Sequence, residues 1–368
     1  MIRVGVVGCG HVAREAYLPG LAALGEDRAR VVAVFDTLQE RVDDALAKLP
    51  HAAGYTTYDA FLDHDGGNGI DLVFNLTPAP LHRDITARAL EAGYHVYTEK
   101  PIASTVEEAE ELAAIADAQA KVLFSAPSIM VTARFAWLRE MLDAGEIGRP
   151  TLAKASIGNM GPAAWRAYIG DPRVFYKKGV GPLVDVGVYM LHAITGLLGP
   201  ATRVQASGGI VIPERTILID RYWGEKVQVD TPDVLSINLD LGENRYAHLF
   251  ASFATPSSKA PMFELYGTEG AFSIGARDWY SGNGGTDIFT IDTDREGGRG
   301  EWRDNVPPPT RIVPEDILGA GIVHAVDCLE KGTESVLTAR HATHVLEIMN
   351  GALASIESGE AVEITTSF

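Results

Sequence analysis

One short segment near the N-terminus constrains the fold of this chain more than any other: Gly8-Cys9-Gly10-His11-Val12-Ala13. It follows an apolar run at residues 2–7 and precedes a stretch whose leucines have helical spacing. The glycines permit a tight turn and a close approach of the backbone to a pyrophosphate, while Ala13 still allows close helix–strand packing. The helix start adds amide donors and a favourable dipole. The order strand, glycine turn, helix therefore predicts a dinucleotide-binding unit.

An acidic residue ends the next expected strand, where the ribose of a dinucleotide would bind. The apolar run 31–35 is followed by Asp36, whose carboxylate can accept hydrogen bonds from ribose hydroxyls. Its distance from the glycines exceeds the usual spacing of about 20 residues, and the polar insertion 25–28 accounts for the excess. The alternative role for Asp36 is a helix cap. Thr37 follows, and Arg41 is the nearest basic residue, so we expect NAD(H), with NADP(H) as a possibility.

Strands and helices continue to alternate as far as about residue 125, which predicts a parallel, doubly wound sheet. The expected helices are 38–49, 81–92 and 105–118, and the expected strands are 71–75, 95–98 and 122–124. Leu76, Thr77 and Pro78 lie at the C-terminal end of a strand, so they should line the cofactor cleft. His82 opens the following helix, where it either contacts the nicotinamide half or serves as a cap.

A lysine follows the strand 95–98, in the sequence Tyr97-Thr98-Glu99-Lys100-Pro101. Its side chain should project from the C-terminal edge of the sheet, where open α/β sheets bind ligands. Pro101 restricts its own backbone and that of Lys100, which stiffens the turn. Such a lysine can polarise an oxygen that gains or loses a proton. An isolated tripeptide of this kind is more often a surface Glu–Lys pair, but the neighbouring motifs reverse that preference.

The second part of the chain has a different pattern, and the boundaries predicted are 1–125 and 126–368. Short turns separate several strands between residues 203 and 275, which favours antiparallel pairing. The remaining expectations are helices 135–143, 182–198, 317–329 and 339–358, a strand at 151–156, a polar-aromatic loop at 163–178 and an irregular segment at 276–313. The fold class is therefore α/β plus α+β, a Rossmann domain followed by a large, mostly antiparallel sheet.

Three polar residues fall on one stripe of the expected helix 182–198. Asp185, Tyr189 and His192 stand at i, i+4 and i+7, so they share a face of an otherwise apolar helix. Pro182 suits the first helical position. The stripe is either a satisfied buried network or part of a site, because buried polar groups need hydrogen-bond partners.

Composition excludes several classes of function. The net charge of −18 and pI of about 4.9 disfavour a nucleic-acid partner or an anionic membrane. No apolar run is long enough for a transmembrane helix and no signal peptide is recognisable, so a cytoplasmic location is expected. Cys9 lies in the glycine turn, so a disulfide with Cys328 is not expected. The pair His341 and His344 is expected on a solvated helix face, and no metal is expected.

The motifs occur in an order that resembles the Gfo/Idh/MocA family of nicotinamide-dependent oxidoreductases, over roughly residues 1–275. The resemblance rests on Gly8-Cys9-Gly10-His11-Val12-Ala13, Thr77-Pro78 with His82, Glu99-Lys100-Pro101, Trp165-Arg166, Gly181-Pro182-Leu183-Val184-Asp185-Val186-Gly187 and Tyr266-Gly267-Thr268-Glu269-Gly270. It implies a Rossmann domain, a second domain whose sheet often forms dimer contacts, and a sugar, polyol or related hydroxyl substrate bound between the domains. A homodimer or homotetramer is expected.

The resemblance also assigns roles to residues. Lys100 matches the lysine of the EKP motif, and Asp185 matches the aspartate of the second motif. Tyr189 stands where many members carry a histidine acid/base, and His192 replaces a frequent aspartate or asparagine. Tyr189 is the leading proton donor or acceptor, since the charge of Lys100 favours a phenolate. His192 is the alternative, and Asp185 would bind substrate or orient Tyr189.

The remaining contacts follow from the same comparison. Trp165, Arg166 and Tyr176 should shape the mouth of the substrate site. Cofactor contacts are expected from Gly8, Cys9, Gly10, His11, Val12, Asp36, Thr37, Arg41, Leu76, Thr77, Pro78, His82, Glu99, Lys100, Trp165 and Arg166. The sequence therefore predicts an NAD(P)-dependent dehydrogenase or reductase. The alternatives are a non-catalytic nucleotide- or sugar-binding sensor or scaffold, and an enzyme acting on a non-sugar ketone or diol.

Overall fold

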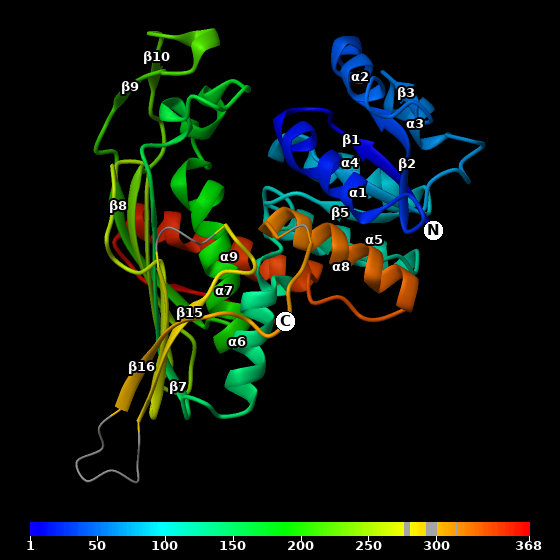
Figure 1. Cartoon of the computed structure of the whole chain (residues 1–368). Helices are drawn as coiled ribbons and strands as arrows, with labels where there is room; N and C mark the ends of the chain where they lie inside the picture. The colour runs from blue at the N-terminus through cyan, green and yellow to red at the C-terminus, as the bar shows by residue number, and fades with distance from the viewer. Residues whose placement is uncertain (276–279, 292–299, 314) are drawn as a thin grey trace. The chain divides into compact units, whose positions relative to one another are not determined.

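The computed structural model describes residues 1–275, 280–291, 300–313 and 315–368 (Figure 1). The chain divides into two compact units. The first consists of Met1–Val131 with Val313–Leu346, and the second of Thr132–Ile312 with Glu347–Phe368. Within the described residues, no helix combines the length and the apolar composition needed to cross a membrane.

The first unit contains a six-stranded parallel sheet in the order β3-β2-β1-β4-β5-β6. Its strands are β1 Ile2–Val7, β2 Ala29–Phe35, β3 Ala53–Tyr55, β4 Leu72–Asn75, β5 His95–Thr98 and β6 Leu123–Ser125. This is the strand order of the dinucleotide-binding Rossmann fold, and it confirms the predicted sheet. Val7 pairs with Asn75, and Asn75 with Thr98, so the three central strands end level with one another.

Helices connect these strands in the predicted order. They are the π-helical segment η1 Ala13–Tyr17, α1 Leu18–Leu24, α2 Gln39–Leu46, α3 Tyr58–Leu62, the 3₁₀ turn η2 Ala79–Leu81, α4 His82–Glu91 and α5 Val106–Ala118. Thr105 and Glu108 form a capping box at the start of α5, and Gly93 follows α4 with a φ of 87°. The short pieces β3 and α3 were not predicted, because three to five residues are too few to establish a hydrophobic period.

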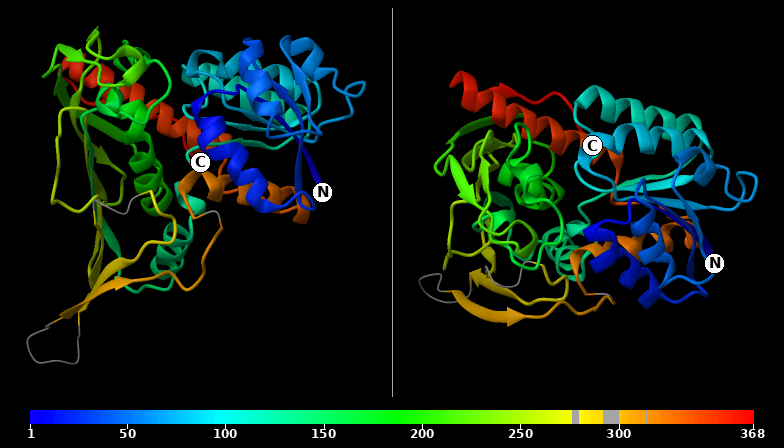
Figure 2. Two further views of the ribbon diagram at one scale, coloured as in Figure 1. Left: turned by 45° about the horizontal axis from the view of Figure 1, so that its top comes forward. Right: turned by 90° about the horizontal axis from the view of Figure 1, so that it is seen from above.

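Helix α8, Ile317–Lys331, belongs to the first unit although it comes late in the chain. This differs from the expected single boundary near residue 125. Leu318, Ile322 and Val326 are buried in the same hydrophobic core as the first strands and α1. Figure 2 shows α8, in orange, alongside α1, in blue, and the two helices are in contact. The apolar face of α8 therefore completes the core of the Rossmann unit.

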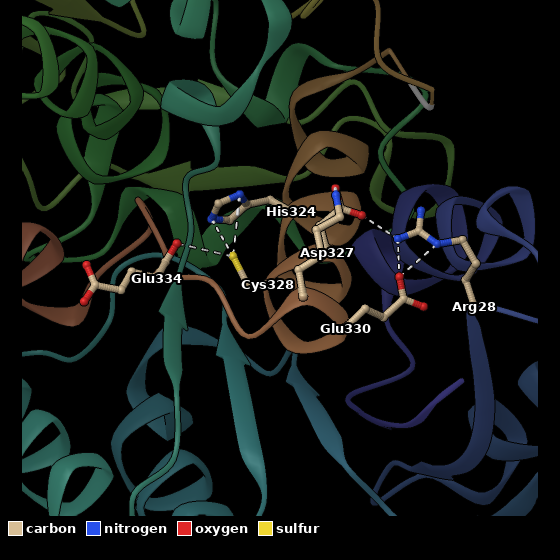
Figure 3. A network of polar contacts seen from close by, with 7 residues as sticks. Arg28, His324, Asp327, Cys328, Glu330 and Glu334 are labelled. Atoms are coloured by element: carbon tan, nitrogen blue, oxygen red, sulfur yellow. Dashed lines mark hydrogen bonds and ion pairs between the residues drawn. The ribbon is translucent and has the colours of Figure 1, made fainter.

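Charged residues fasten α8 to the start of β2 (Figure 3). Arg28 forms ion pairs with Asp327 and with Glu330, the second at 2.6 Å. Lys331 adds a 2.8 Å contact to Asp327. The pairs are partly exposed, so they are worth little individually. Their effect is to fix the position of a helix whose apolar face is already buried.

Figure 3 also shows Cys328, whose contacts give it a structural role. Its sulfur lies 3.5 Å from Nε2 of His324 and donates to the carbonyl of Glu334. The amide of Val336 donates to the same Nε2 at 3.3 Å, so this nitrogen is the acceptor of the ring. Burial raises the pKa of Cys328 and lowers that of His324. A neutral thiol beside a neutral ring stabilises the turn after α8, and both Cys9 and Cys328 are free thiols, as expected.

The second unit contains a nine-stranded sheet in the order β16-β15-β14-β13-β7-β12-β11-β8-β17. Strands β7 and β12 are parallel, and the other neighbouring pairs are antiparallel, as predicted. The strands are β7 Pro150–Gly158, β8 Arg203–Gly209, β11 Val234–Asp240, β12 Tyr246–Ser252, β13 Phe263–Gly267, β14 Gly270–Ile274, β15 Thr286–Ile291, β16 Gly300–Val306 and β17 Val362–Glu363. The prediction of an irregular segment at 276–313 was wrong for β15 and β16, and residues 276–279 and 292–299 lie outside the described residues.

Helices and a small hairpin complete the second unit. The helices are α6 Ala133–Asp143, the π-helical segment η6 Leu183–Gly187, α7 Val188–Leu198 and α9 Ala339–Ser358, which begins in the first unit. A separate hairpin consists of β9 Glu214–Thr216 and β10 Lys226–Gln228. It contacts the 3₁₀ turns η4 Pro162–Ala164 and η5 Pro172–Tyr176. Helix α7 packs on β7 and β12, so its residues are almost all buried.

The two histidines at the start of α9 are buried, so the expectation of a solvated helix face was wrong. His341 is 4% exposed and His344 is fully buried, because the helix packs into the protein along this face. Among the described residues, no group of three or more His, Cys, Asp or Glu side chains could hold a metal ion.

We expect His341 to make stability depend on pH. Burial and the nearby His344 lower its pKa to about 3, whereas a histidine in the unfolded chain has a pKa of about 6.5. Between these values the unfolded chain binds more protons, so the free energy of unfolding should fall as the pH drops from about 6.5 to 3.

Thermal melts from pH 7 to pH 4 measure this effect. His341→Gln should flatten the decline, and His51→Gln, at an exposed position, should leave it unchanged. An identical decline in His341→Gln and the parent protein would show that other groups cause it.

Candidate functional site

Gly8 and Gly10 have different roles in the first turn. Gly8 has a φ of 90°, and a Cβ added there would lie 2.9 Å from the carbonyl carbon and oxygen of Leu76. Gly8 is therefore required by the fold. A Cβ added at Gly10 would meet nothing within 4 Å, so this position faces open space. The open space beside Gly10 fits a pyrophosphate approaching the backbone.

The helix that follows this turn begins at His11 and includes the π-helical segment η1. The amides of a first helical turn have no intrahelical acceptors, and the helix dipole favours an anion beside them. His11 and Val12 supply two of these amides. The turn and the helix start thus form one anion-binding surface, and π-helical segments are frequent at functional sites.

Asp36 is 6% exposed and braces this turn from the end of β2. One carboxylate oxygen accepts from the amide of Cys9 at 3.0 Å, and the other accepts from the amide of Leu38 at 3.0 Å. Nη1 of the half-exposed Arg41 lies 3.5 Å away. Burial, with the charge of Asp36, raises the pKa of Cys9 to about 12. Cys9 is therefore a neutral thiol, and the carboxylate orients the glycine turn.

The loop after β4 is held by a buried amide. Oδ1 of Asn75 accepts from the hydroxyl of Thr77 at 2.6 Å, and from its amide at 3.3 Å. Nδ2 of Asn75 donates to Thr86 at 3.0 Å and to the carbonyl of His82 at 3.2 Å. Both ends of one fully buried side chain are thus satisfied. Asn75 thus ties Thr77 to the helix α4.

His82 joins this loop to the lysine turn. It is 1% exposed, with Nδ1 2.6 Å from the carbonyl of Pro101 and Nε2 2.7 Å from the carbonyl of Thr77. Two carbonyl acceptors call for two N–H donors, which only the imidazolium has. Burial lowers the pKa of His82, while the two carbonyls and the charge of Glu99 oppose that shift. The imidazolium donates to both carbonyls and the neutral ring to one of them, so His82 is a brace between these main-chain segments.

Glu99 also fixes the turn that carries Lys100. The hydroxyl of Tyr17 donates to one carboxylate oxygen of Glu99 at 2.6 Å, and the amide of Lys100 donates to the other at 3.0 Å. Tyr17 is fully buried and Glu99 is 8% exposed. Burial, followed by the charge of Glu99, raises the pKa of Tyr17, so it remains a donor. The Lys100 backbone is thereby tied to the helix of the glycine turn.

Tyr17 and Asn75 are two supporting residues that the sequence analysis missed. Tyr17 does lie four residues after Ala13 and four before Leu21, on the apolar stripe of the first helix. A tyrosine in a buried stripe needs an acceptor for its hydroxyl, which is the signal that was available. Which acceptor it finds depends on the sheet order, because Glu99 is far away along the chain.

In the second unit, the three polar residues of the predicted stripe lie on one continuous helical run. Asp185 is half-buried in the π-helical segment η6, and Tyr189 and His192 are 7% and 4% exposed in α7. Tyr189 and His192 are three residues apart in an α-helix and are neighbours on its surface. The helical run begins with a π-helical segment, a feature that is frequent at functional sites.

The loop 163–178 has exposed aromatic residues above a buried one. Trp165 is 53% exposed, and Arg166 forms an exposed 3.5 Å ion pair with Asp220. Tyr176 has no exposed surface, and its hydroxyl accepts from the amide of Ala163 at 3.0 Å. This differs from the position at the mouth that was expected for Tyr176. It supports the loop from beneath, while Trp165 and Arg166 are at the surface.

The two glycines provide a direct test of cofactor binding. Gly10→Ala should fold normally and bind NADH at least about ten-fold more weakly, because a methyl group enters the pyrophosphate space. Gly8→Ala should instead lower the melting temperature, because its Cβ meets main chain at a positive φ. Circular dichroism melts and NADH fluorescence titrations separate the effects. Unchanged NADH affinity in Gly10→Ala would mean that the pyrophosphate binds elsewhere.

Tyr17→Phe should lower the rate of reaction more than it lowers NADH affinity. The change leaves one oxygen of the buried Glu99 without its donor, which commonly costs about 1–3 kcal/mol, and it loosens the Lys100 turn. Tyr58→Phe is the matched control, since this buried tyrosine donates only to the carbonyl of Ile85. A loss of kcat in Tyr17→Phe no larger than that in Tyr58→Phe would refute a positioning role.

Comparison with known proteins identifies the family of this chain. Residues 2–126 match the oxidoreductase family with an NAD-binding Rossmann fold, and residues 135–273 match the GFO/IDH/MocA C-terminal domain. A dTDP-3,4-didehydro-2,6-dideoxy-alpha-D-glucose 3-reductase of Streptomyces violaceoruber is 31% identical over 206 residues, 56% of this chain and 57% of that protein. D-glucoside 3-dehydrogenase of Escherichia coli (strain K12) is 30% identical over 208 residues, 55% of this chain and 56% of the relative.

The match thus spans a little over half the length of each of these relatives. Levoglucosan dehydrogenase in complex with NADH and L-sorbose has the same fold, with a TM-score of 0.83 and 20% identity over 100% of this chain and 99% of that chain. Because both domain types match in order, the chain belongs to the Gfo/Idh/MocA family of NAD-binding oxidoreductases.

Proposed function

We propose that this protein is an NAD(H)-dependent oxidoreductase that transfers a hydride between the cofactor and a hydroxyl or keto carbon of a sugar or polyol. The observation that carries the proposal is the buried brace around Lys100. Tyr17 and His82 hold the lysine turn to the same sheet edge as the open glycine turn. A fixed lysine beside a dinucleotide site suits polarisation of a reacting oxygen. The names of the relatives support a sugar substrate.

Bound NAD would supply the hydride acceptor or donor. The first unit binds and orients it: the helix start after Gly10 neutralises the pyrophosphate, and Asp36 offers carboxylate oxygens toward the ribose. Lys100 donates from its ammonium group to the substrate oxygen and stabilises negative charge there. Because its backbone is held at both Glu99 and Pro101, little rearrangement is needed when the substrate binds.

Residues of the second unit are proposed to move the proton and bind neighbouring hydroxyls. Tyr189 gives or takes the proton of the reacting hydroxyl, and Asp185 and His192 bind adjacent hydroxyls or orient Tyr189. A half-buried carboxylate with two buried polar side chains on one helix suits a polyhydroxylated ligand. Trp165 and Arg166 lie on a loop of the same unit and are proposed to contact the substrate.

A cytoplasmic homodimer or homotetramer completes the proposal. Strands β8 and β11 alternate buried residues with exposed or half-buried ones, so one face of the large sheet is open in a single chain. Large antiparallel sheets commonly cover such a face with another element or another subunit. A second copy of this chain is therefore the proposed partner.

The function is tested by a substrate screen. Sugars, inositols and their keto forms are mixed with NAD⁺, NADP⁺ and both reduced cofactors, and absorbance of the reduced nicotinamide is followed. We expect turnover of a sugar or polyol that Lys100→Met abolishes while NADH binding persists. Sugar binding without hydride transfer in single-turnover spectroscopy would favour a sensor. Turnover of simple ketones alone would favour the non-sugar alternative.

NADH should bind more tightly than NADPH, by about ten-fold or more, because the Asp36 carboxylate repels a 2′-phosphate. Arg41 is half-exposed beside Asp36, and its positive charge would favour the 2′-phosphate of NADPH. Arg41→Ala should therefore weaken NADPH more than NADH. Arg30→Ala, which removes the partner of Glu26 at the other end of β2, is the control. Tighter binding of NADPH than NADH by fluorescence titration would reverse the assignment.

Lys100 and Tyr189 should be coupled in catalysis. Lys100→Met and Tyr189→Phe should each lower kcat by about 10²–10⁴-fold, as expected for positioned proton-transfer groups. The double variant should lose less than the product of the two, because groups that act as a unit are non-additive. Tyr189→His should retain more activity than Tyr189→Phe. Normal kcat in Tyr189→Phe together with inactivity of His192→Ala would transfer the proton role to His192.

A further inference from the structure

Two segments of the second unit present a group of aromatic side chains at the surface, which we call the aromatic platform. Two of its residues are highly exposed tryptophans, Trp165 at 53% and Trp223 at 58%. One segment is 162–176 and the other is the connection between β9 and β10 (Figure 1). The members of the platform are Trp165, Tyr168, Phe175, Tyr222 and Trp223. Grouped exposed aromatic residues mark binding surfaces more often than isolated ones do.

The rings of the platform are organised by one another and by an arginine. Trp165 stacks on Tyr168 with centroids 5.7 Å apart and an interplanar angle of 27°. Tyr168 meets Phe175 edge-on at 5.7 Å. The guanidinium of Arg166 lies over the ring of Trp223 at 5.2 Å. Because Arg166 follows Trp165 directly, it links the two exposed tryptophans across the two segments.

A buried ion pair fixes the hairpin beneath the platform. Nη2 of Arg215 lies 2.7 Å from Asp233, Nη1 donates to the carbonyl of Met160 at 3.0 Å, and the guanidinium lies over the ring of Tyr176. Both charged side chains are at most 5% exposed, so removing either partner would leave a buried charge. The amide of Leu218 also donates to the segment 162–176. The platform is therefore pre-organised, which lowers the cost of binding a ligand.

The charges around the rings favour an uncharged ligand. Arg166 pairs with Asp220 at 3.5 Å. Arg173 lies over the ring of Tyr222, and it pairs with Asp171 at 3.0 Å and also with Glu225. These two arginines are neutralised by carboxylates on the same two segments as the platform. A diphosphate would meet those carboxylates, whereas the faces of Trp165 and Trp223 suit the C–H groups of a pyranose or an aryl ring.

The platform is joined to the helix that carries Asp185. Tyr176 lies beneath the platform segment, where its hydroxyl accepts from the amide of Ala163. The amide of Asp230 donates to the carbonyl of Tyr176 at 2.8 Å, and a Cβ added at Gly181, where the helical run of Asp185 begins, would lie 3.0 Å from the carbonyl oxygen of Pro232. The platform segment and the start of the helical run that carries Asp185 therefore pack against the same residues, 230–232.

We propose that the aromatic platform binds a second ring of the substrate, an uncharged pyranose or aryl group joined by a glycosidic bond to the sugar whose carbon is oxidised. The proposal rests on the proposed function and narrows its substrate class to glycosides. Trp223 and Trp165 form the ring-binding faces. Arg166 fixes the orientation of Trp223.

Calorimetric titration tests the platform without any turnover. The probes are methyl β-D-glucoside, which has one ring, and phenyl β-D-glucoside, cellobiose and maltose, which have two. We expect at least one two-ring probe to bind about ten-fold more tightly than the one-ring probe, and Trp223→Ala to remove that advantage. Trp302→Ala is the control, because this tryptophan is 50% exposed on β16 and packs on Phe289.

The outcomes separate the platform from the proposed function. Equal affinity for one-ring and two-ring probes, or a two-ring advantage that survives in Trp223→Ala, overturns the platform. A dTDP titration that Trp223→Ala weakens overturns the uncharged ligand. A change of mass in light scattering of Trp223→Ala identifies an interface between copies instead. Binding of glycosides on the platform without hydride transfer would overturn only the proposed function.

Discussion

The arrangement of the cofactor edge depends on one buried carboxylate. Glu99 accepts from the hydroxyl of Tyr17 and from the amide of Lys100, so the helix after the glycine turn and the lysine turn share a single acceptor. A carboxylate this buried is costly unless its lone pairs are filled. The geometry of the lysine turn is therefore coupled to correct packing of the first helix. His82 has a similar positioning role on the other side of the lysine turn, because its two ring nitrogens lie within hydrogen-bond distance of the carbonyl oxygens of Thr77 and Pro101.

A similar principle governs the second unit, where the buried Arg215 pairs with Asp233, donates to the carbonyl of Met160 and lies over the ring of Tyr176, so it holds the small hairpin to this region. Buried ion pairs contribute little net stability compared with apolar packing, but they are strongly directional. Each unit thus uses a few desolvated polar groups to position loops, while apolar side chains supply the driving force for folding. In both units the loops positioned in this way carry the residues to which we assign function.

Most of the architecture could be predicted because it depends on local patterns. Residues 2–7 and 31–35, together with the glycine turn between them, indicated the Rossmann unit, and the observed strand order agrees. The short β3 and α3 escaped prediction because their periods are too brief. Strand β16 escaped because it is an edge strand that is mostly exposed and therefore lacks alternation, and β15 is its short neighbour in the sheet. His341 and His344 illustrate the opposite error, since polar residues suggested a solvated face where packing buries both.

Local chemistry along the chain was enough to establish the dinucleotide unit, the position of Lys100 at a strand end and the polar stripe on the helix 182–198. Spacing alone encodes these features, because glycine turns, strand ends and helical periods extend over only a few residues. Three features could be seen only in the folded structure. They are the hydrogen-bond partners of Glu99, the packing of α8 in the core of the first unit, and the burial of Tyr176 beneath its loop. Each joins residues that are distant along the chain, and hydrogen bonds and packing act on proximity in space, which the order of residues does not display.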